Sequence, residues 1–369
     1  MNVDARARAS AQAIDRSATR VNPFAGLDDL LRRRRRQPLQ RAAAVAVALL
    51  VMVVAVWAGG VRLGPTPVQP TPGPVTRIAV GPMPVSVAVT PGTAWVLDGS
   101  TPIITRIDAR TGRLQSTFSA SFAQQLDGYL VFAMAAEGRL WVVHWQDLRG
   151  AAMSVIDPST GQKLMTFVFG GHVLQALNKP GDITVGSGAV WVALQADDQV
   201  KRFDAATGKL LDQIPLPEPT ALAVDGKTLW VATADGRLRS IDTGTGAATV
   251  RATTEMVTRI RVGQGGVWLM TYDGKVLRLD PRTGQIVARV PGTFQAADLA
   301  VGTEGVWAYD QHQGTVLRID PSTNQVDRII PVISQPLVEL DSRVLALGDG
   351  AVWVVDKGSE ALVRVNPNG

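Results

Sequence analysis

The sequence predicts an all-β protein, and three observations support this fold class. A tryptophan flanked by apolar residues recurs seven times, the stretches between these tryptophans alternate apolar and polar residues, and turn sequences such as "DPST" follow them. Alternation with period 2 is typical of β-strands, and no stretch of the repeat sustains the 3.6-residue period of a helix. The chain is therefore expected to fold as a series of similar small sheets.

The seven tryptophans define the unit of this repeat. They are Trp95, Trp141, Trp191, Trp230, Trp268, Trp307 and Trp353. Their spacing of 38 to 50 residues is near the roughly 40–45 residues of a four-stranded propeller blade. Around Trp268 we expect the four strands, a to d, at Val257–Val262, Val267–Met270, Val276–Asp280 and Ile286–Val290. Each repeat unit is therefore expected to form one four-stranded blade.

Two repeated residue types have a structural role in this interpretation. Each tryptophan is expected to pack between neighbouring blades, since a large ring supplies apolar area that one small sheet lacks; an aromatic ligand cage is the less favoured alternative. An aspartate at the end of strand c in six of the seven units is expected to accept hydrogen bonds from the following turn, in preference to binding a metal. These aspartates are Asp108, Asp157, Asp204, Asp242, Asp280 and Asp320.

The two ends of the repeat complement one another. The last unit stops after strand c, in "ALVRVNPNG" at Gly369, whereas the strand-like segment Val75–Val80 precedes the first complete unit. An unclosed ring leaves exposed sheet edges, which invite aggregation. We therefore expect Val75–Val80 to supply the missing strand d, so that residues 75–369 form a closed seven-bladed β-propeller.

These motifs resemble a known group of proteins. The "GAVWV" and "RIDPST" elements are similar to those of seven-bladed propellers built from YVTN, NHL or PQQ-like repeats, a group that includes the virginiamycin B lyase-like proteins. The resemblance implies the architecture, but such propellers include lyases, lactonases, dehydrogenases, ligand binders and scaffolds. Lyase-like activity relies on histidine and acidic groups with a divalent metal over the channel, and no residue here matches that set one for one.

Residues 42–61 predict a membrane span. The segment "AAAVAVALLVMVVAVWAGGV" has 20 residues without a charge, about 30 Å of helix and one hydrocarbon core. The run "RRRRR" before it predicts that residues 1–41 are cytoplasmic and that the propeller is extracytoplasmic. A cleaved signal peptide is the alternative, with "VWA" at Val56–Ala58 as its cleavage site. The long basic segment before the span favours an uncleaved anchor.

The flanking segments are too short or too biased to fold alone. Residues 62–74 are rich in proline and predict a semi-extended linker. The tail, residues 1–41, is expected to be a disordered basic segment with a juxtamembrane helix, and a docking site for a cytoplasmic regulator is the alternative. The chain has no cysteine, which excludes disulfides, lipidated cysteine and thiolate zinc sites.

The charge distribution argues against nucleic-acid binding. Residues 1–41 contain ten arginines and four aspartates, a net charge of +6, so the whole-chain +5 leaves −1 for everything after residue 41. A nearly neutral folded domain beside a membrane span gives the basic run a topological role rather than a phosphate-binding one. The run is also suited to contact with anionic lipid head groups.

The face formed by the b–c and d–a connections is the candidate functional face, because its loops are long while the a–b and c–d turns are short. The long segments are Ser116–Gly128, His144–Gly150, Phe169–Asp182 and Pro331–Arg343. The candidate ligand-binding residues on or beside them are His144, Trp145, Asp147, Arg149, His172, Asp310 and His312. The three histidines either meet over the central channel, as a metal or acid-base centre, or are separate solvated loop residues. No local metal-ligand spacing is present.

Three classes of function remain. The favoured one is a single-pass membrane protein whose extracytoplasmic propeller binds a ligand or protein, acting as a sensor or binding module. The others are an extracytoplasmic lyase or hydrolase with its site on the long-loop face, and a structural adaptor at the cell envelope. The sequence contains no GxSxG or HExxH motif, and "DGKT" at Asp225–Thr228 lacks the spacing of a phosphate loop. This favours binding over catalysis and identifies no cofactor.

Overall fold

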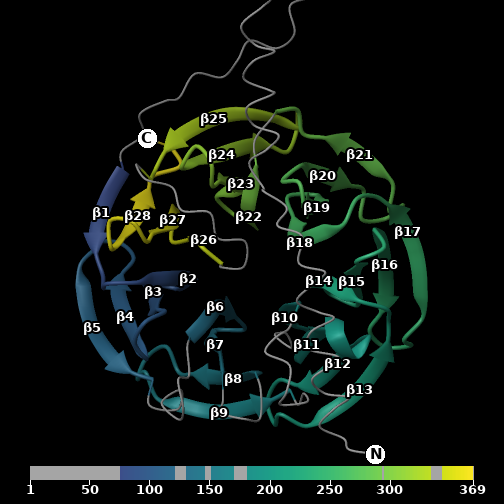
Figure 1. The fold of residues 1–369 in the computed structure, drawn as a ribbon, viewed down its shortest axis with the longest axis horizontal. Coiled ribbons are helices and arrows are strands. Elements are labelled where there is room, and N and C mark those ends of the chain that lie inside the picture. Colours follow the sequence, from purple (N-terminus) through teal and green to yellow (C-terminus); the bar gives the residue numbers. More distant parts are fainter. Residues whose placement is uncertain are drawn as a thin grey trace, which may run out of the picture. The chain divides into compact units, whose positions relative to one another are not determined.

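The computed structural model describes residues 75–120, 130–145, 151–169, 181–292, 295–333 and 343–368. These residues form seven antiparallel four-stranded sheets, the blades, arranged in a ring. In each blade strand a lies nearest the centre of the ring and strand d lies on the outside (Figure 1). The all-β class and the seven-bladed β-propeller are therefore confirmed.

The first four blades are consecutive in the sequence. Blade 1 contains β2 (Pro84–Thr90), β3 (Thr93–Asp98), β4 (Ile103–Asp108) and β5 (Leu114–Ser119). Blade 2 contains β6 (Leu130–Ala136), β7 (Arg139–Trp145), β8 (Ala151–Ile156) and β9 (Lys163–Val168). Blade 3 contains β10 (Asp182–Gly186), β11 (Ala189–Leu194), β12 (Gln199–Asp204) and β13 (Leu210–Pro215), with a 3₁₀ turn, η3 (Gln195–Asp197), before β12. Blade 4 contains β14 (Pro219–Asp225), β15 (Thr228–Thr233), β16 (Arg237–Asp242) and β17 (Ala248–Thr253).

The remaining blades complete the ring. Blade 5 contains β18 (Val257–Gly263), β19 (Gly266–Thr271), β20 (Val276–Leu279) and β21 (Ile286–Arg289), within two residues of the predicted bounds. Blade 6 contains β22 (Ala296–Gly302), β23 (Gly305–Asp310), β24 (Thr315–Asp320) and β25 (Gln325–Pro331). Blade 7 contains β26 (Leu345–Gly348), β27 (Ala351–Asp356), β28 (Ala361–Val365) and β1 (Val75–Ala79).

The N-terminal strand closes the ring, as the sequence predicts. β1 pairs antiparallel with β28, with Val75 opposite Val365 and Ala79 opposite Ala361. In Figure 1 the purple β1 lies beside the yellow β28, so the two ends of the propeller share one sheet. Arg77 of β1 donates to Asp356 at 2.8 Å and to the Val332 carbonyl at 2.9 Å.

The seven repeat tryptophans form the contacts between blades. Each is at most 2% exposed, and each lies on the second strand of its blade. Trp353 of blade 7, for example, belongs to one apolar cluster with Val87 and Ile107 of blade 1. Burying about 150–250 Å² of an aromatic side chain at about 25 cal/mol per Å² contributes roughly 4–6 kcal/mol. The predicted inter-blade packing is confirmed.

Arginines on strand c link several blades to the next. Arg202 stacks 4.9 Å from the Trp191 ring centroid and donates to the Thr243 carbonyl of blade 4 at 2.9 Å. Arg364 lies 5.6 Å from the Trp353 ring centroid and donates to the Ala109 carbonyl of blade 1 at 3.2 Å. The same kind of link therefore joins blade 7 to blade 1, where the ring closes. Such cations on tryptophan faces add attraction beyond burial.

The aspartates at the strand c ends have the predicted role. Asp108 Oδ1 accepts the backbone N–H of Arg110 and Thr111, and Asp242 Oδ1 accepts that of Gly244 and Thr245. The Thr111 and Thr245 N–H groups lower the pKa of Asp108 and Asp242 respectively. Equivalent bonds are made by Asp157, Asp204, Asp280 and Asp320.

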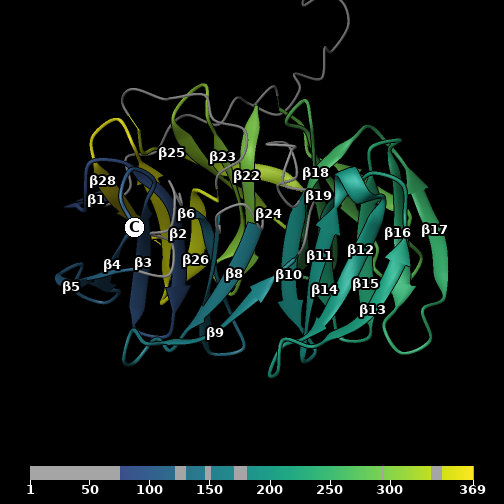
Figure 2. The same ribbon diagram turned by 60° about the horizontal axis from the view of Figure 1, so that its bottom comes forward.

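The ends of the strands lie on two opposite faces of the ring (Figure 2). The a–b and c–d turns share one face; the a–b turns are short, as at residues 91–92 and 226–227. The b–c and d–a connections share the other, which we call the long-loop face, and its d–a connections include residues 120–129, 169–181 and 332–344. The predicted transmembrane segment, residues 42–61, lies outside the described residues. Within the described ranges, no helix has the length and apolarity to cross a membrane.

Candidate functional site

His144 lies inside a blade rather than on a loop. It is in β7, its side chain is fully buried, and its Nε2 is 2.9 Å from Ser154 Oγ. Ser154 Oγ in turn is 3.0 Å from Thr166 Oγ1, so a polar chain runs across three strands of blade 2. A buried imidazole needs such partners, because an unpaired polar group in the interior is costly.

Asp310 and His312 lie together in blade 6. Asp310 ends β23, is 1% exposed, and its Oδ1 accepts the N–H of His312 at 2.9 Å and of Gln313 at 3.0 Å. The His312 side chain is exposed on the long-loop face. Asp310 therefore organises the turn that carries His312.

The other predicted site residues are not brought together by the described part of the structure. Trp145 is the last residue of β7, and nothing is described of its side chain. Asp147, Arg149 and His172 lie outside the described residues. Among the residues that are described, no three His, Cys, Asp or Glu side chains form a group suited to a metal. The hypothesis that the three histidines meet stays a prediction.

Buried aspartates at the end of strand b form a family that includes Asp310. Asp98 and Asp356 hold the same position in blades 1 and 7, and Thr233 and Thr271 hold it in blades 4 and 5. Burial acts to raise the pKa of Asp98, but hydrogen bonds from the Ser100 hydroxyl and from the backbone of Ser100, Met83 and Thr101 outweigh it and lower the pKa. These aspartates accept hydrogen bonds from the b–c turns that follow them. The burial of Asp310 is explained by this structural role.

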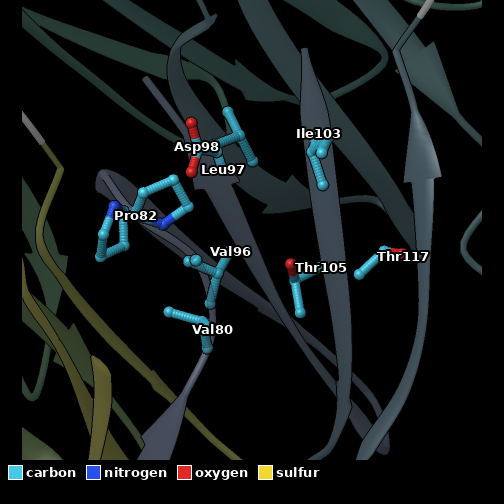
Figure 3. Close-up of a pocket in the computed structure, with 10 residues that line it drawn as sticks. Val80, Pro82, Val96, Leu97, Asp98, Ile103, Thr105 and Thr117 are labelled. Carbon is cyan, nitrogen blue, oxygen red and sulfur yellow. The ribbon is translucent and has the colours of Figure 1, made fainter. Parts of the chain in front are cut away.

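A cavity of about 130 Å³ lies under the β1–β2 connection (Figure 3). Val80 and Pro82 come from that connection, and Ile103, Thr105 and Thr117 come from β4 and β5 of blade 1. The cavity is smaller than the roughly 300–1,000 Å³ of typical ligand pockets. Its lining is largely apolar, with the two threonines and Asp98 as polar groups.

The centre of the ring carries a charged cluster that the sequence reading missed. Arg343, just before β26, donates to Asp182 Oδ1 and to the Ile183 carbonyl, both at 2.6 Å, and its guanidinium carbon lies 4.4 Å from the Phe132 ring centroid. It thereby joins blade 7 to blades 2 and 3. Arg259 and Arg261 of β18 lie 3.7 and 3.9 Å from Asp298 Oδ1.

The signal for this cluster was present in the sequence. The innermost strand of blade 5 reads "VTRIRVG", whereas the same strand of blade 4 reads "PTALAVD" and that of blade 6 reads "AADLAVG". Arg261 therefore stands where blades 4 and 6 have alanine, and Arg259 stands where blade 4 has Ala221 and blade 6 has Asp298. Burial, followed by the nearby charge of Arg343, lowers the pKa of Arg261 to about 10, while Asp298 and Asp182 act in the opposite direction.

The sequence itself matches a known family. Residues 100–326, more than half of the chain, match the PQQ-like family model described as outer membrane protein assembly factor BamB. The chain belongs to this family. The predicted membership of the PQQ-like group of propellers is therefore confirmed. Among curated protein sequences, none matches the chain.

Several solved structures share the fold of this PQQ-like family member. A computationally designed protein, Ika8, is 18% identical, with a TM-score of 0.55 over 78% of this chain and 97% of its own. Raptor of Chaetomium thermophilum is 12% identical, with a TM-score of 0.61 over 79% of this chain and 29% of its own. A chain of a mitotic checkpoint complex is 13% identical, with a TM-score of 0.61 over 82% of this chain and 94% of its own. At these identities the likeness concerns the propeller alone.

Proposed function

We propose that the chain is a membrane-anchored, extracytoplasmic binding module that engages its ligand or partner protein through the long-loop face. The observation that supports this most is the inequality of the two faces of the ring. One face carries the a–b and c–d turns, which have two to six residues, and the other carries the d–a connections of residues 120–129, 169–181 and 332–344. A rigid ring that presents variable loops on one side is the usual arrangement of a binding scaffold.

An exposed aromatic residue on the same face supports the proposal. Tyr272, in the β19–β20 connection, is 62% exposed, more than any other large hydrophobic side chain among the described residues. Tyrosine combines a large apolar ring with a polar tip and is enriched at recognition surfaces. The family description, an assembly factor, favours a protein as the partner.

The test is photo-crosslinking in intact cells from single positions on the two faces. A photoreactive residue in place of Tyr272 or His312 should give discrete adducts. The same residue in place of Lys227 or Arg282, both exposed on the short-turn face, should give few. Adducts confined to Lys227 and Arg282 would assign binding to the wrong face, and equal labelling of all four positions would remove the claim of a preferred face.

The location is tested separately. The proposed anchor rests on the uncharged residues 42–61 and the preceding arginine run. Protease added to intact cells, or to spheroplasts if an outer membrane is present, should remove the propeller and leave an N-terminal tag intact. A propeller that resists protease until the inner membrane is opened would contradict the proposed orientation.

A further inference from the structure

The two central arginines of blade 5 have few partners. Arg259 Nη1 donates to the Thr258 carbonyl at 2.8 Å, and Arg261 Nη1 donates to the Ile260 carbonyl at 2.8 Å. The Arg259 side chain is 9% exposed, and its Nε is buried without a hydrogen-bond partner among the described residues. A buried donor without a partner is unusual in a folded protein and calls for an acceptor.

The nearby carboxylates do not supply that acceptor. Asp298 Oδ1 accepts the Leu299 N–H at 2.9 Å and Oδ2 accepts the Leu345 N–H at 3.0 Å. Its separations of 3.7 Å from Arg259 Nε and 3.9 Å from Arg261 Nη2 are beyond hydrogen-bond distance. Asp298 thus joins blade 6 to blade 7 and only faces the arginines.

Asp182 is engaged in the same way. Its Oδ1 accepts from Arg343 at 2.6 Å and its Oδ2 accepts the Leu222 N–H of blade 4 at 3.0 Å. The cluster therefore holds three guanidinium groups and two carboxylates, a net charge of +1, with the excess on Arg259 and Arg261. A negatively charged ligand is favoured beside this excess of positive charge, because the two arginines are partly desolvated.

The strand a position that Arg261 occupies carries a small side chain in most other blades. Arg261 is the strand a residue paired with the repeat tryptophan of its blade, and the equivalent residue is alanine in four of the other blades. These are Ala88, Ala223, Ala300 and Ala346, with Met134 and Thr184 in the remaining two. The Arg261 side chain is 22% exposed, so solvent reaches it.

We propose that Arg259 and Arg261 bind a small oxyanion, a carboxylate or a phosphate, at the centre of the ring. This inference rests on the proposed binding function and names the chemistry of one of its ligands. A guanidinium presents a planar set of donors that matches two oxygens of such an anion. A bound anion accepts from Arg259 Nε and from the free Arg261 nitrogens, and it lowers the repulsion among the three arginines.

The experiment follows the thermal unfolding midpoint of the full-length protein in detergent. Inorganic phosphate and, separately, succinate are titrated at constant ionic strength. The wild type should show a saturable rise with at least one of them, and which one responds identifies the anion. The Arg261→Gln variant should need about tenfold more anion for the same rise, since one charge-assisted contact is lost.

Controls keep the result decisive. Arg289→Gln removes an exposed arginine of the same blade, in β21, and should respond as the wild type does. Arg261→Lys keeps the positive charge but loses the planar set of guanidinium donors. The anion concentration it needs should fall between those of the wild type and Arg261→Gln. Arg261→Lys also serves as the test variant if Arg261→Gln does not fold. No saturable rise in the wild type, or an unchanged response in Arg261→Gln, would overturn the proposal. If the anion test fails but the photoreactive residue at position 272 still gives discrete adducts, only the anion site is contradicted and the proposed binding function is retained.

Discussion

Arg343 Nη2 lies 2.6 Å from Asp182 Oδ1, an ion pair that joins the segment before β26 in blade 7 to the start of β10 in blade 3. The two side chains are 14% and 3% exposed. A pair this far from solvent needs accurate geometry, because desolvation of both charges opposes it. The ion pair joins blades 7 and 3, which have blades 1 and 2 between them, so its geometry depends on the arrangement of the whole ring.

The two buried tryptophans Trp95 and Trp191 should differ in their sensitivity to replacement. Trp95 Nε1 donates to Thr90 Oγ1 at 2.8 Å, whereas Trp191 Nε1 is buried without a partner among the described residues. Phenylalanine removes the N–H group in both cases. We expect Trp191→Phe to cost about 1–2 kcal/mol less than Trp95→Phe in urea unfolding, because Trp191 has no hydrogen bond to lose. Equal losses would contradict the hydrogen-bond assignment.

Two glycines with similar backbone angles should respond differently to alanine. Gly236 has φ 79° and Gly246 has φ 72°. A Cβ on Gly236 would collide with the Thr254 carbonyl, whereas a Cβ on Gly246 would meet nothing within 4 Å. Gly246→Ala should cost about 1 kcal/mol from backbone strain alone, and Gly236→Ala about 3 kcal/mol or more. Urea midpoints measure both, and similar values would show that the β15–β16 turn adapts freely.

Acidification should weaken the c–d turns. The Thr245 N–H lowers the pKa of Asp242 below its ordinary 3.8, so the folded state favours the carboxylate. That stabilisation is present above about pH 4 and is lost as the pH falls through the lower folded pKa. Asp242→Asn should therefore reduce the slope of stability against pH below about pH 4. An Asp242→Asn variant with the same slope as the wild type would contradict this role of the carboxylate.

His144 and His312 should separate a structural role from a metal-binding one. His144 is fully buried against Ser154, and His312 is exposed. We expect His144→Ala to destabilise the protein by about 2–4 kcal/mol through a cavity and the loss of the hydrogen bond to Ser154, and His312→Ala to have little effect. A near-stoichiometric divalent metal in the wild type that both variants lose would instead support the three-histidine centre.

The repeat made the fold readable from the sequence. Each Trp and each Asp of a c–d turn acts within its own blade or against its neighbour, so local spacing indicated the strands, and the orphan segment Val75–Val80 indicated closure. The ring centre was not readable in this way. Arg261 faces Asp298 only through the register of strands a in neighbouring blades. Arg343 reaches Asp182 from a connection without a repeat pattern. The anchor and the long loops remain predictions from sequence.

β1 closes the ring by pairing with β28. The position of Arg343 opposite Asp182 and the common orientation of the long-loop face both depend on this closure. The chain has no cysteine, so a disulfide can report it directly. Thr76 of β1 and Arg364 of β28 are paired residues, and the roughly 4.5–5.5 Å between Cα atoms of such pairs suits a disulfide.

The measurement is disulfide formation in the full-length Thr76→Cys, Arg364→Cys variant after mild oxidation. We expect nearly complete crosslinking, seen as two fragments that stay joined without reductant after one cut within the propeller. The Thr76→Cys, Asp225→Cys variant, with its second cysteine in blade 4, should not crosslink. Folded Thr76→Cys, Arg364→Cys protein that keeps both thiols free under the same conditions would contradict the closed ring.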